Sequence, residues 1–149
     1  MKLNFIYSFV YFEILNKSND VSHSWEDVKK MGKSFERKYS EELRQITALI
    51  PKVVNKSWTK NEINVFIVDW PGPSFSSPLT LKVRVDKLLM LVILAHELLH
   101  TFYGDIKITE KMELEINNNV KKVFTKLGLD IACQMEKLER IHKDRFRSK

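Results

Sequence analysis

The sequence predicts an α+β domain, because strand-like segments occupy the first half of the chain and helix-like segments fill the second half. The chain has 149 residues, of which 44% are hydrophobic and 30% are charged. This is a globular composition at the size of one ordinary domain. We therefore expect a single domain, residues 1–149, with a sheet and a backing helix in residues 1–85 and further helices in residues 86–149.

The first half contains three strand-like segments and one long helical segment. Residues 3–14 carry Val, Ile, Phe and Tyr on both faces, which is typical of a strand inside a sheet. Residues 25–50 place apolar side chains at helical spacing, and Pro51 ends this pattern. Residues 63–70 form a second apolar strand. The alternation over residues 79–85 favours a half-exposed strand at the edge of the sheet.

Three helices are expected in the second half, each with a capping residue at its start. Asp86 precedes a helix over residues 87–103, and Thr109 begins one over residues 109–127. A glycine follows each of these two helices, as is typical of C-terminal stops. The last helix spans residues 130–147, and its apolar stripe predicts packing on the core: Ile131, Met135, Leu138 and Ile141.

Charge and cysteine content bear on the compartment and the partners. The net charge is +6, but the lysines and arginines are spread along the chain, so nucleic-acid binding is possible without being favoured. The single cysteine, Cys133, excludes an intrachain disulfide and fits a reducing compartment, and we expect it to be a buried small hydrophobe. The apolar run over residues 88–95 is far shorter than the roughly 20 residues that cross a bilayer. We expect a cytoplasmic protein with no membrane partner.

Residues 95–100 read AHELLH, and this stretch belongs to the most apolar helix of the chain. On a helix, His96 and His100 are about 400° apart and project from nearly the same side. Two imidazoles at this spacing can bind one Zn²⁺ at about 2.0–2.1 Å each. Glu97, rotated by about 100°, can take a proton from a water molecule at the metal and pass it to a leaving amine. The pattern predicts metal-dependent hydrolysis with Glu97 as the catalytic residue. The alternative is a pair of core histidines that bond to backbone or carboxylate oxygens.

The next helix offers the third protein ligand that a catalytic zinc site needs. Its apolar stripe must face the core. Glu113 falls inside this stripe, whereas Glu110 and Glu115 fall toward solvent. A buried carboxylate needs a cation, so Glu113 is the expected ligand and Glu115 the alternative. Asn117, four residues after Glu113, can accept a hydrogen bond from the second ring N–H of a histidine ligand. Ordinary helix-boundary roles for Glu113 and Asn117 remain open.

The stretch ILAHELLH, followed by a helix that carries ELEIN, resembles gluzincin-type zinc metallopeptidases. The small size is similar to that of the minigluzincins, and the Glu-x-Glu-x-Asn spacing also resembles HExxH peptidases of phage-repressor and DNA-damage control. The resemblance covers residues 79–127. The family's Asn-Glu-x-x-x-Asp pattern reads MELEIN here, and by elimination Tyr103 and His142 are the candidates to stabilise an oxyanion.

This resemblance implies a zincin-like fold and a way of binding substrate. The fold would have a short, twisted, mostly antiparallel sheet with a backing helix, an active-site helix and a C-terminal glutamate helix. The last sheet strand, here residues 79–85, would border the cleft and bind an extended peptide by strand addition.

Three hypotheses about function follow. The leading one is a zinc-dependent metallopeptidase that acts on a peptide or protein substrate, with Zn²⁺ bound by His96, His100 and Glu113. A second is an HExxH-core regulatory protein associated with nucleic acid, which a steep salt dependence of DNA binding would support. A third is a non-catalytic or latent metal-binding protein, in which the helix over residues 130–147 folds over the cleft. The sequence leaves the substrate and the oligomeric state open.

Overall fold

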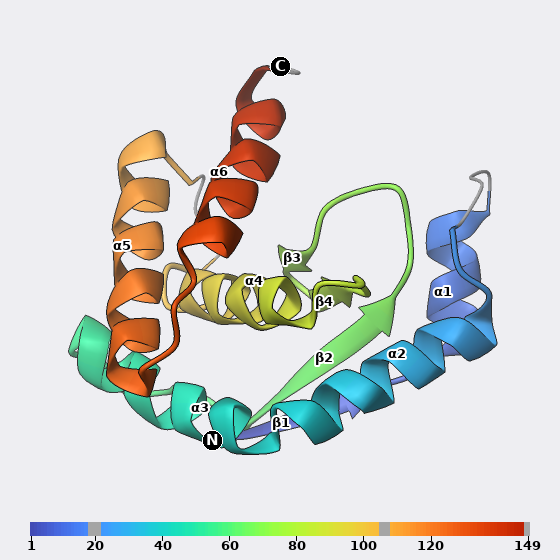
Figure 1. Ribbon diagram of the computed structural model, residues 1–149, viewed down its shortest axis with the longest axis horizontal. Helices are drawn as coiled ribbons and strands as arrows, with labels where there is room; N and C mark the ends of the chain where they lie inside the picture. The colour runs from blue at the N-terminus through green and yellow to red at the C-terminus, as the bar shows by residue number, and fades with distance from the viewer. Residues whose placement is uncertain (18–21, 105–107, 148–149) are drawn as a thin grey trace.

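The computed structural model describes residues 1–17, 22–104 and 108–147, with side chains through residue 141 (Figure 1). This part of the chain forms an α+β fold of six helices and a small mixed sheet of four strands. The strands are β1 (Lys2–Ile6), β2 (Glu62–Val68), β3 (Phe75–Ser76) and β4 (Leu79–Lys82). The helices are α1 (Phe9–Asn16), α2 (Trp25–Lys38), α3 (Ser40–Val54), α4 (Lys87–His100), α5 (Glu110–Leu127) and α6 (Ala132–Arg147).

The strand order is β1-β2-β4-β3, and the expectation of a mostly antiparallel sheet is wrong. Strands β1 and β2 pair in parallel, as do β2 and β4, and the short β3–β4 pair is antiparallel. The connection from β1 to β2 carries three helices, and a long helical crossover of this kind returns the chain in the same direction. Strand β3 therefore lies at the edge of the sheet, and β4 lies inside it.

The predicted edge strand over residues 79–85 is thus an interior strand that ends at Lys82. Its alternating polar residue Thr80 is fully buried, because α1 covers that face of the sheet. The hydroxyl of Tyr11 on α1 bonds to the Thr80 hydroxyl at 2.9 Å, and the Tyr11 ring lies 4.8 Å from that of Phe66. The alternation of polar and apolar residues predicted that Thr80 faces solvent. In the structure α1 covers this residue, and the Tyr11 hydroxyl bonds to it.

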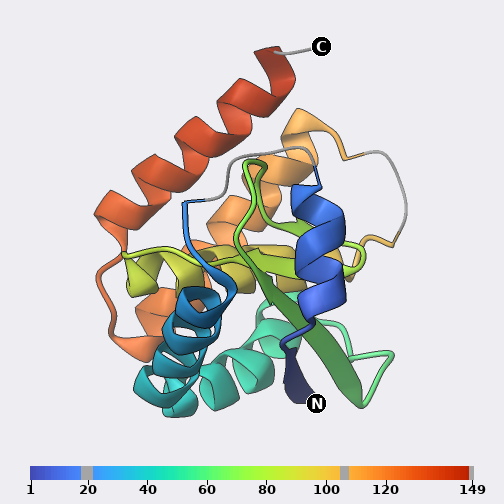
Figure 2. The ribbon, with the colours of Figure 1, turned by 90° about the vertical axis from the view of Figure 1, so that its right-hand side faces the viewer.

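The predicted strand over residues 3–14 is confirmed only as far as Ile6, because the chain then turns into α1, and β1 lies at the edge of the sheet instead of inside it. Ser8 caps this helix, and its hydroxyl accepts a hydrogen bond from the Tyr11 N–H at 3.2 Å. Figure 2 shows α1 on one side of the sheet and α2 and α3 on the other. A short apolar segment of this kind fits a strand or a helix by its pattern. In α1 only Phe12 is buried, and its ring packs on that of Trp25 at 5.4 Å.

The long helical segment is divided at Tyr39, whose backbone (φ −115°, ψ 25°) separates α2 from α3. Pro51 does not end α3, which continues to Val54. Proline has no N–H to give to the carbonyl four residues earlier. Here that carbonyl, of Thr47, accepts a hydrogen bond from the Trp58 indole at 2.8 Å. The side chain thus replaces the backbone donor, and the helix tolerates the proline in its last turn.

Helices α4 and α5 begin where the sequence predicts. Asp86 caps α4 by accepting from the Leu89 N–H at 3.0 Å, and Thr109 caps α5. Gly128 ends α5 in the left-handed conformation (φ 69°), whereas α4 ends at His100 and is followed by a turn. Figure 1 shows α4 in the middle of the molecule, with α5 and α6 beside it. Residues 89–100 of α4 are all buried, so this helix forms the centre of the core.

Helix α6 packs on the core as expected, with Ile131, Met135 and Leu138 buried. Cys133, expected to be buried, is exposed, because it lies on the outer side of this amphipathic helix. Lys137 of α6 forms an ion pair with the capping carboxylate of Asp86 at 2.8 Å. Among the described residues, no helix combines the length and the apolar character that crossing a membrane requires.

Candidate metal centre

The motif residues lie in the last two turns of α4, deep in the protein. His96 is 0% exposed, Glu97 4% and His100 6%. The preceding turns of the helix are apolar and fully enclosed by the sheet and by α3, α5 and α6. An ionisable side chain in such a position needs a bonded partner, because burial without one costs several kcal/mol. Their burial therefore indicates a polar site within the core in which each of these side chains has a partner.

Helix α5 brings a carboxylate to the two imidazoles. The Nε2 atoms of His96 and His100 are 2.8 Å apart. The Glu113 carboxylate lies 3.4 Å from Nε2 of His96 and 3.5 Å from Nε2 of His100. One ligand atom from each of the three side chains falls within 4.8 Å of the others. This buried group can bind a metal ion.

Part of this geometry matches what a small tetrahedral ion requires. Two ligand atoms at about 2.0–2.1 Å from such an ion lie roughly 3.3–3.4 Å apart. The two contacts of Glu113 are near this separation, although Oε2 approaches His96 and Oε1 approaches His100. The two ring nitrogens, at 2.8 Å, are closer by roughly 0.5 Å. A slight rotation of one imidazole would open the space that the ion needs.

Asn117 fixes the orientation of one of the two rings. Its side-chain oxygen lies 3.1 Å from Nδ1 of His96, one turn after Glu113 on α5. An amide oxygen can accept a hydrogen bond but cannot donate one, so Nδ1 of His96 carries the proton. Nε2 of His96 then presents its lone pair toward Glu113 and His100. A histidine ligand is commonly held by such an oxygen on its far nitrogen.

The two glutamates that competed for the ligand role are separated by the fold. Glu113 is 8% exposed and faces the histidines, in agreement with the expectation from the helical wheel. Glu115 is exposed and accepts a hydrogen bond from the Tyr103 hydroxyl instead. Burial and, secondarily, this contact with Glu115 raise the pKa of Tyr103 to about 12. The Tyr103 hydroxyl therefore keeps its proton throughout the neutral range.

The remaining histidines do not contribute to the described group. His23 donates from its backbone N–H to the buried Asp69 carboxylate at 3.0 Å, and its ring Nδ1 lies 2.9 Å from the same oxygen. These contacts join the segment before α2 to the residue that follows β2. The side chain of His142 lies outside the described residues.

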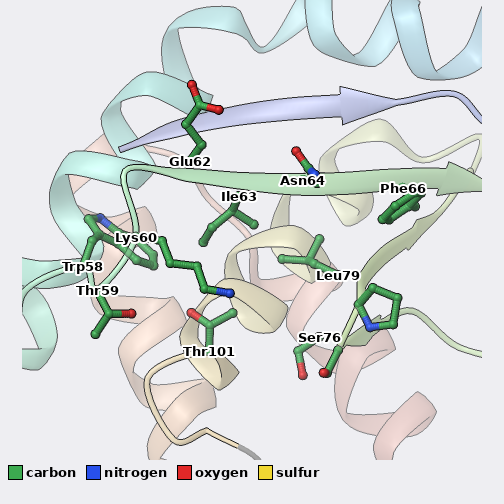
Figure 3. Close-up of a pocket in the computed structure, with 12 residues that line it drawn as sticks. Trp58, Thr59, Lys60, Glu62, Ile63, Asn64, Phe66, Ser76, Leu79 and Thr101 are labelled. Carbon is green, nitrogen blue, oxygen red and sulfur yellow. The ribbon is translucent and has the colours of Figure 1, made fainter.

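A cavity of about 530 Å³ opens beside the C-terminal end of α4 (Figure 3). Thr101, the residue after His100, lines it together with residues from β2, from the β3–β4 turn and from the segment before β2. Sequence reasoning missed these lining residues, in particular Trp58 and Lys60. Nothing in their local pattern indicates a site, because the segments meet only when the sheet forms.

The chain matches no protein-family model, no curated protein and no solved structure. Its function is therefore inferred from the residues and the geometry of this centre.

Proposed function

We propose that this protein is a zinc-dependent metallopeptidase of the gluzincin type, similar in size to the minigluzincins. The observation that carries the proposal is the approach of Glu113, from a separate helix, to the two histidines of the HExxH motif. Two imidazoles and one carboxylate form a typical donor set of catalytic zinc sites, which leave a fourth position open. His96, His100 and Glu113 would hold the ion.

Glu97 is assigned the acid–base role. When bound, zinc supplies Lewis acidity, which polarises a peptide carbonyl and lowers the pKa of water. Glu97 follows His96 directly on α4, so its carboxylate can remove a proton from the attacking water and return it to the leaving amine. By elimination Tyr103, on the turn after α4, stays the candidate to stabilise the carbonyl oxygen, which would require its hydroxyl to leave Glu115.

Strand β4, which makes up the first part of residues 79–85, leaves no edge for an added strand, so a substrate would pair with β3 or with the open half of β2. Strand β3 lies at the edge of the sheet and contacts α4, whereas β4 has a strand on both sides. An edge strand offers unpaired backbone groups to an extended peptide, and this is a common mode of peptide recognition. The relevant edge residues are Phe75 and Ser76.

The burial of the centre favours a second candidate. His96 is fully buried and Glu97 nearly so, which would suit a latent enzyme or a protein whose metal is structural. This candidate shares the metal ligands with the first and differs in predicting no turnover.

One experiment with two readouts tests both. Purified protein should contain about one zinc ion per chain, and zinc-loaded protein should cleave a quenched-fluorescent casein. Glu97→Gln should keep the zinc and abolish cleavage. Glu115→Gln is the matched control and should keep both the zinc and the cleavage activity. Cleavage by the Glu97→Gln variant at the wild-type rate would disprove the assigned mechanism. Full zinc content without cleavage by the wild type or by Glu115→Gln would favour the second candidate. Absence of zinc from the wild-type protein would exclude both candidates.

A further inference from the structure

The N-terminal half of β2 has an open edge. Strand β4 pairs with β2 at Phe66, Ile67 and Val68, whereas β1 pairs with residues 62–66 on the other side. Within the described chain, residues 62–65 therefore have a strand neighbour on one side. The cavity beside α4 lies at this edge and is lined by Glu62, Ile63 and Asn64.

The backbone of β2 presents hydrogen-bonding groups to this edge. The Val68 carbonyl accepts from the Val83 N–H at 2.8 Å, on the β4 side, whereas the Asn61 carbonyl accepts from the Lys2 N–H, on the β1 side. Backbone groups alternate in direction along a strand, so those of Glu62 and Asn64 point to the β4 side, where β4 is missing. An added strand could pair with them.

The walls of the cavity are partly apolar, and several of their side chains are held in place by contacts. Ile63 and Leu79 point into it, and the Trp58 indole closes one end (Figure 3). The Trp58 ring is held by its bond to the Thr47 carbonyl and by the Phe102 ring at 4.5 Å. Thr101 on the floor donates its hydroxyl proton to the Leu98 carbonyl at 2.7 Å. The cavity is thus a formed feature of the fold.

Lys60 is the charged group that enters this cavity. Figure 3 shows its side chain extending across the cavity toward Thr101, while Glu62 points the other way. The Glu62 carboxylate accepts a hydrogen bond from Asn4 at 3.0 Å on the outer face of the sheet. No ion pair joins Lys60 to another described residue. The cavity therefore combines polar and apolar walls with a lysine ammonium that has no ion pair among the described residues.

We propose that this cavity binds an extended peptide that adds to the open edge of β2 and places an acidic side chain against Lys60. Backbone pairing supplies affinity in strand addition, and a side-chain pocket supplies specificity. Thr101 directly follows His100, so the bound segment would lie at the C-terminal end of the helix that carries the histidines, although neither they nor Glu113 line the cavity. The inference rests on the proposed function in that this segment would be part of the substrate, which makes peptides with an acidic residue the preferred class.

Binding of labelled peptides tests the charge preference without turnover. The probes are three short fluorescein-labelled valine–alanine peptides that differ in one central residue, which is glutamate, glutamine or lysine. Fluorescence anisotropy with the full-length Glu97→Gln protein should show the glutamate peptide binding at least about threefold tighter than the lysine peptide, as expected for a partly exposed ion pair. Lys60→Glu should reverse this order. Lys30→Glu, which makes the same charge change on α2, should leave the order unchanged.

Equal affinity for the three peptides, or equal effects of the two lysine variants, would overturn the proposed charge preference. Strand addition is tested separately by N-methylating alternate amides of the glutamate peptide. Methyl groups in one register should abolish binding and those in the other register should be tolerated, because one edge of the peptide faces β2. Equal effects in both registers would overturn strand addition. The anisotropy measurement needs neither zinc nor cleavage. Its result can therefore be interpreted even if the protein proves to have no peptidase activity.

Discussion

The side-chain oxygen of Asn117 lies 3.1 Å from Nδ1 of His96, although the two residues belong to different helices. Asn117 is one turn after Glu113 on α5, so a single helix face supplies both a carboxylate to the centre and a hydrogen-bond acceptor to a histidine behind it. This arrangement sets the tautomer of His96 before any metal arrives. Substitution of Asn117 therefore tests whether α5 supports the histidines of the centre.

Asn117→Ala should weaken zinc binding by about 10–100-fold, since the His96 ring loses the group that orients it. Asn117→Asp should retain or strengthen binding, because a carboxylate accepts the same hydrogen bond. Competition with a chromophoric chelator measures both affinities. The exposed neighbour Asn118 provides the matched control, and Asn118→Ala should leave the affinity unchanged. An Asn117→Ala protein with wild-type affinity would show that the contact does not support the centre.

Glu113 and Glu115 of α5 should respond in opposite ways to replacement by alanine. Glu113→Ala should abolish stoichiometric zinc binding, because two histidines alone do not complete the donor set. Glu115→Ala should keep the zinc, since this side chain is exposed and bonds to Tyr103. Metal analysis of the purified variants distinguishes the two outcomes. Loss of zinc in the Glu115 variant alone would exchange their roles.

The bounds of α5 and its inward face could be predicted from the sequence, because the signals there are local. The cap at Thr109, the stop at Gly128 and the inward position of Glu113 follow from helical geometry over a few turns. The sheet depends on partners far apart in the chain. No local pattern indicates that β4 lies beside β2, or that Tyr11 covers Thr80 and makes a polar residue an interior one.

Removal of the metal should destabilise the fold. A ligand that binds the native state alone stabilises it by about 2.7 kcal/mol when its concentration is 100 times Kd. For a chain of this size, such a difference corresponds to a rise in Tm of roughly 5–10 °C. Differential scanning calorimetry with zinc and with a chelator measures this shift. Glu113→Ala should show no zinc-dependent shift. Equal Tm values for the wild type in both conditions would contradict a metal bound at this buried centre.

The hydrogen bond from Trp58 to the Thr47 carbonyl should stabilise α3. Trp58→Phe keeps an aromatic ring but leaves this carbonyl without its indole donor, at a cost of about 1–3 kcal/mol in the free energy of unfolding. In the Pro51→Ala background the same change should cost less, because the alanine N–H can bond to Thr47 as in a regular helix. Urea unfolding of the four proteins in this cycle gives the coupling. Equal costs in both backgrounds would show that the indole does not substitute for the missing donor.

The Asp86–Lys137 contact joins the start of α4 to α6 and should make stability depend on pH. Burial opposes the charge of Asp86, but its hydrogen bonds to Lys137 and the Leu89 N–H outweigh this and lower its pKa. A carboxyl whose pKa is lowered by folding stabilises the native state above the ordinary range near about 4, and this contribution is lost as the pH falls through the lowered folded value.

Asp86→Asn isolates this charge, because asparagine is an equally good N-cap. The variant should be less stable than the wild type by about 0.5–1 kcal/mol at neutral pH, given the partial exposure of the pair. The difference should shrink as the pH falls below the ordinary carboxyl range, since both side chains are then neutral. Asp130→Asn, at the exposed start of α6, is the matched control for a carboxylate without an ion pair in the described structure. Urea unfolding across this pH range measures the difference, and a constant difference down to acidic pH would rule out the Asp86 charge as its source.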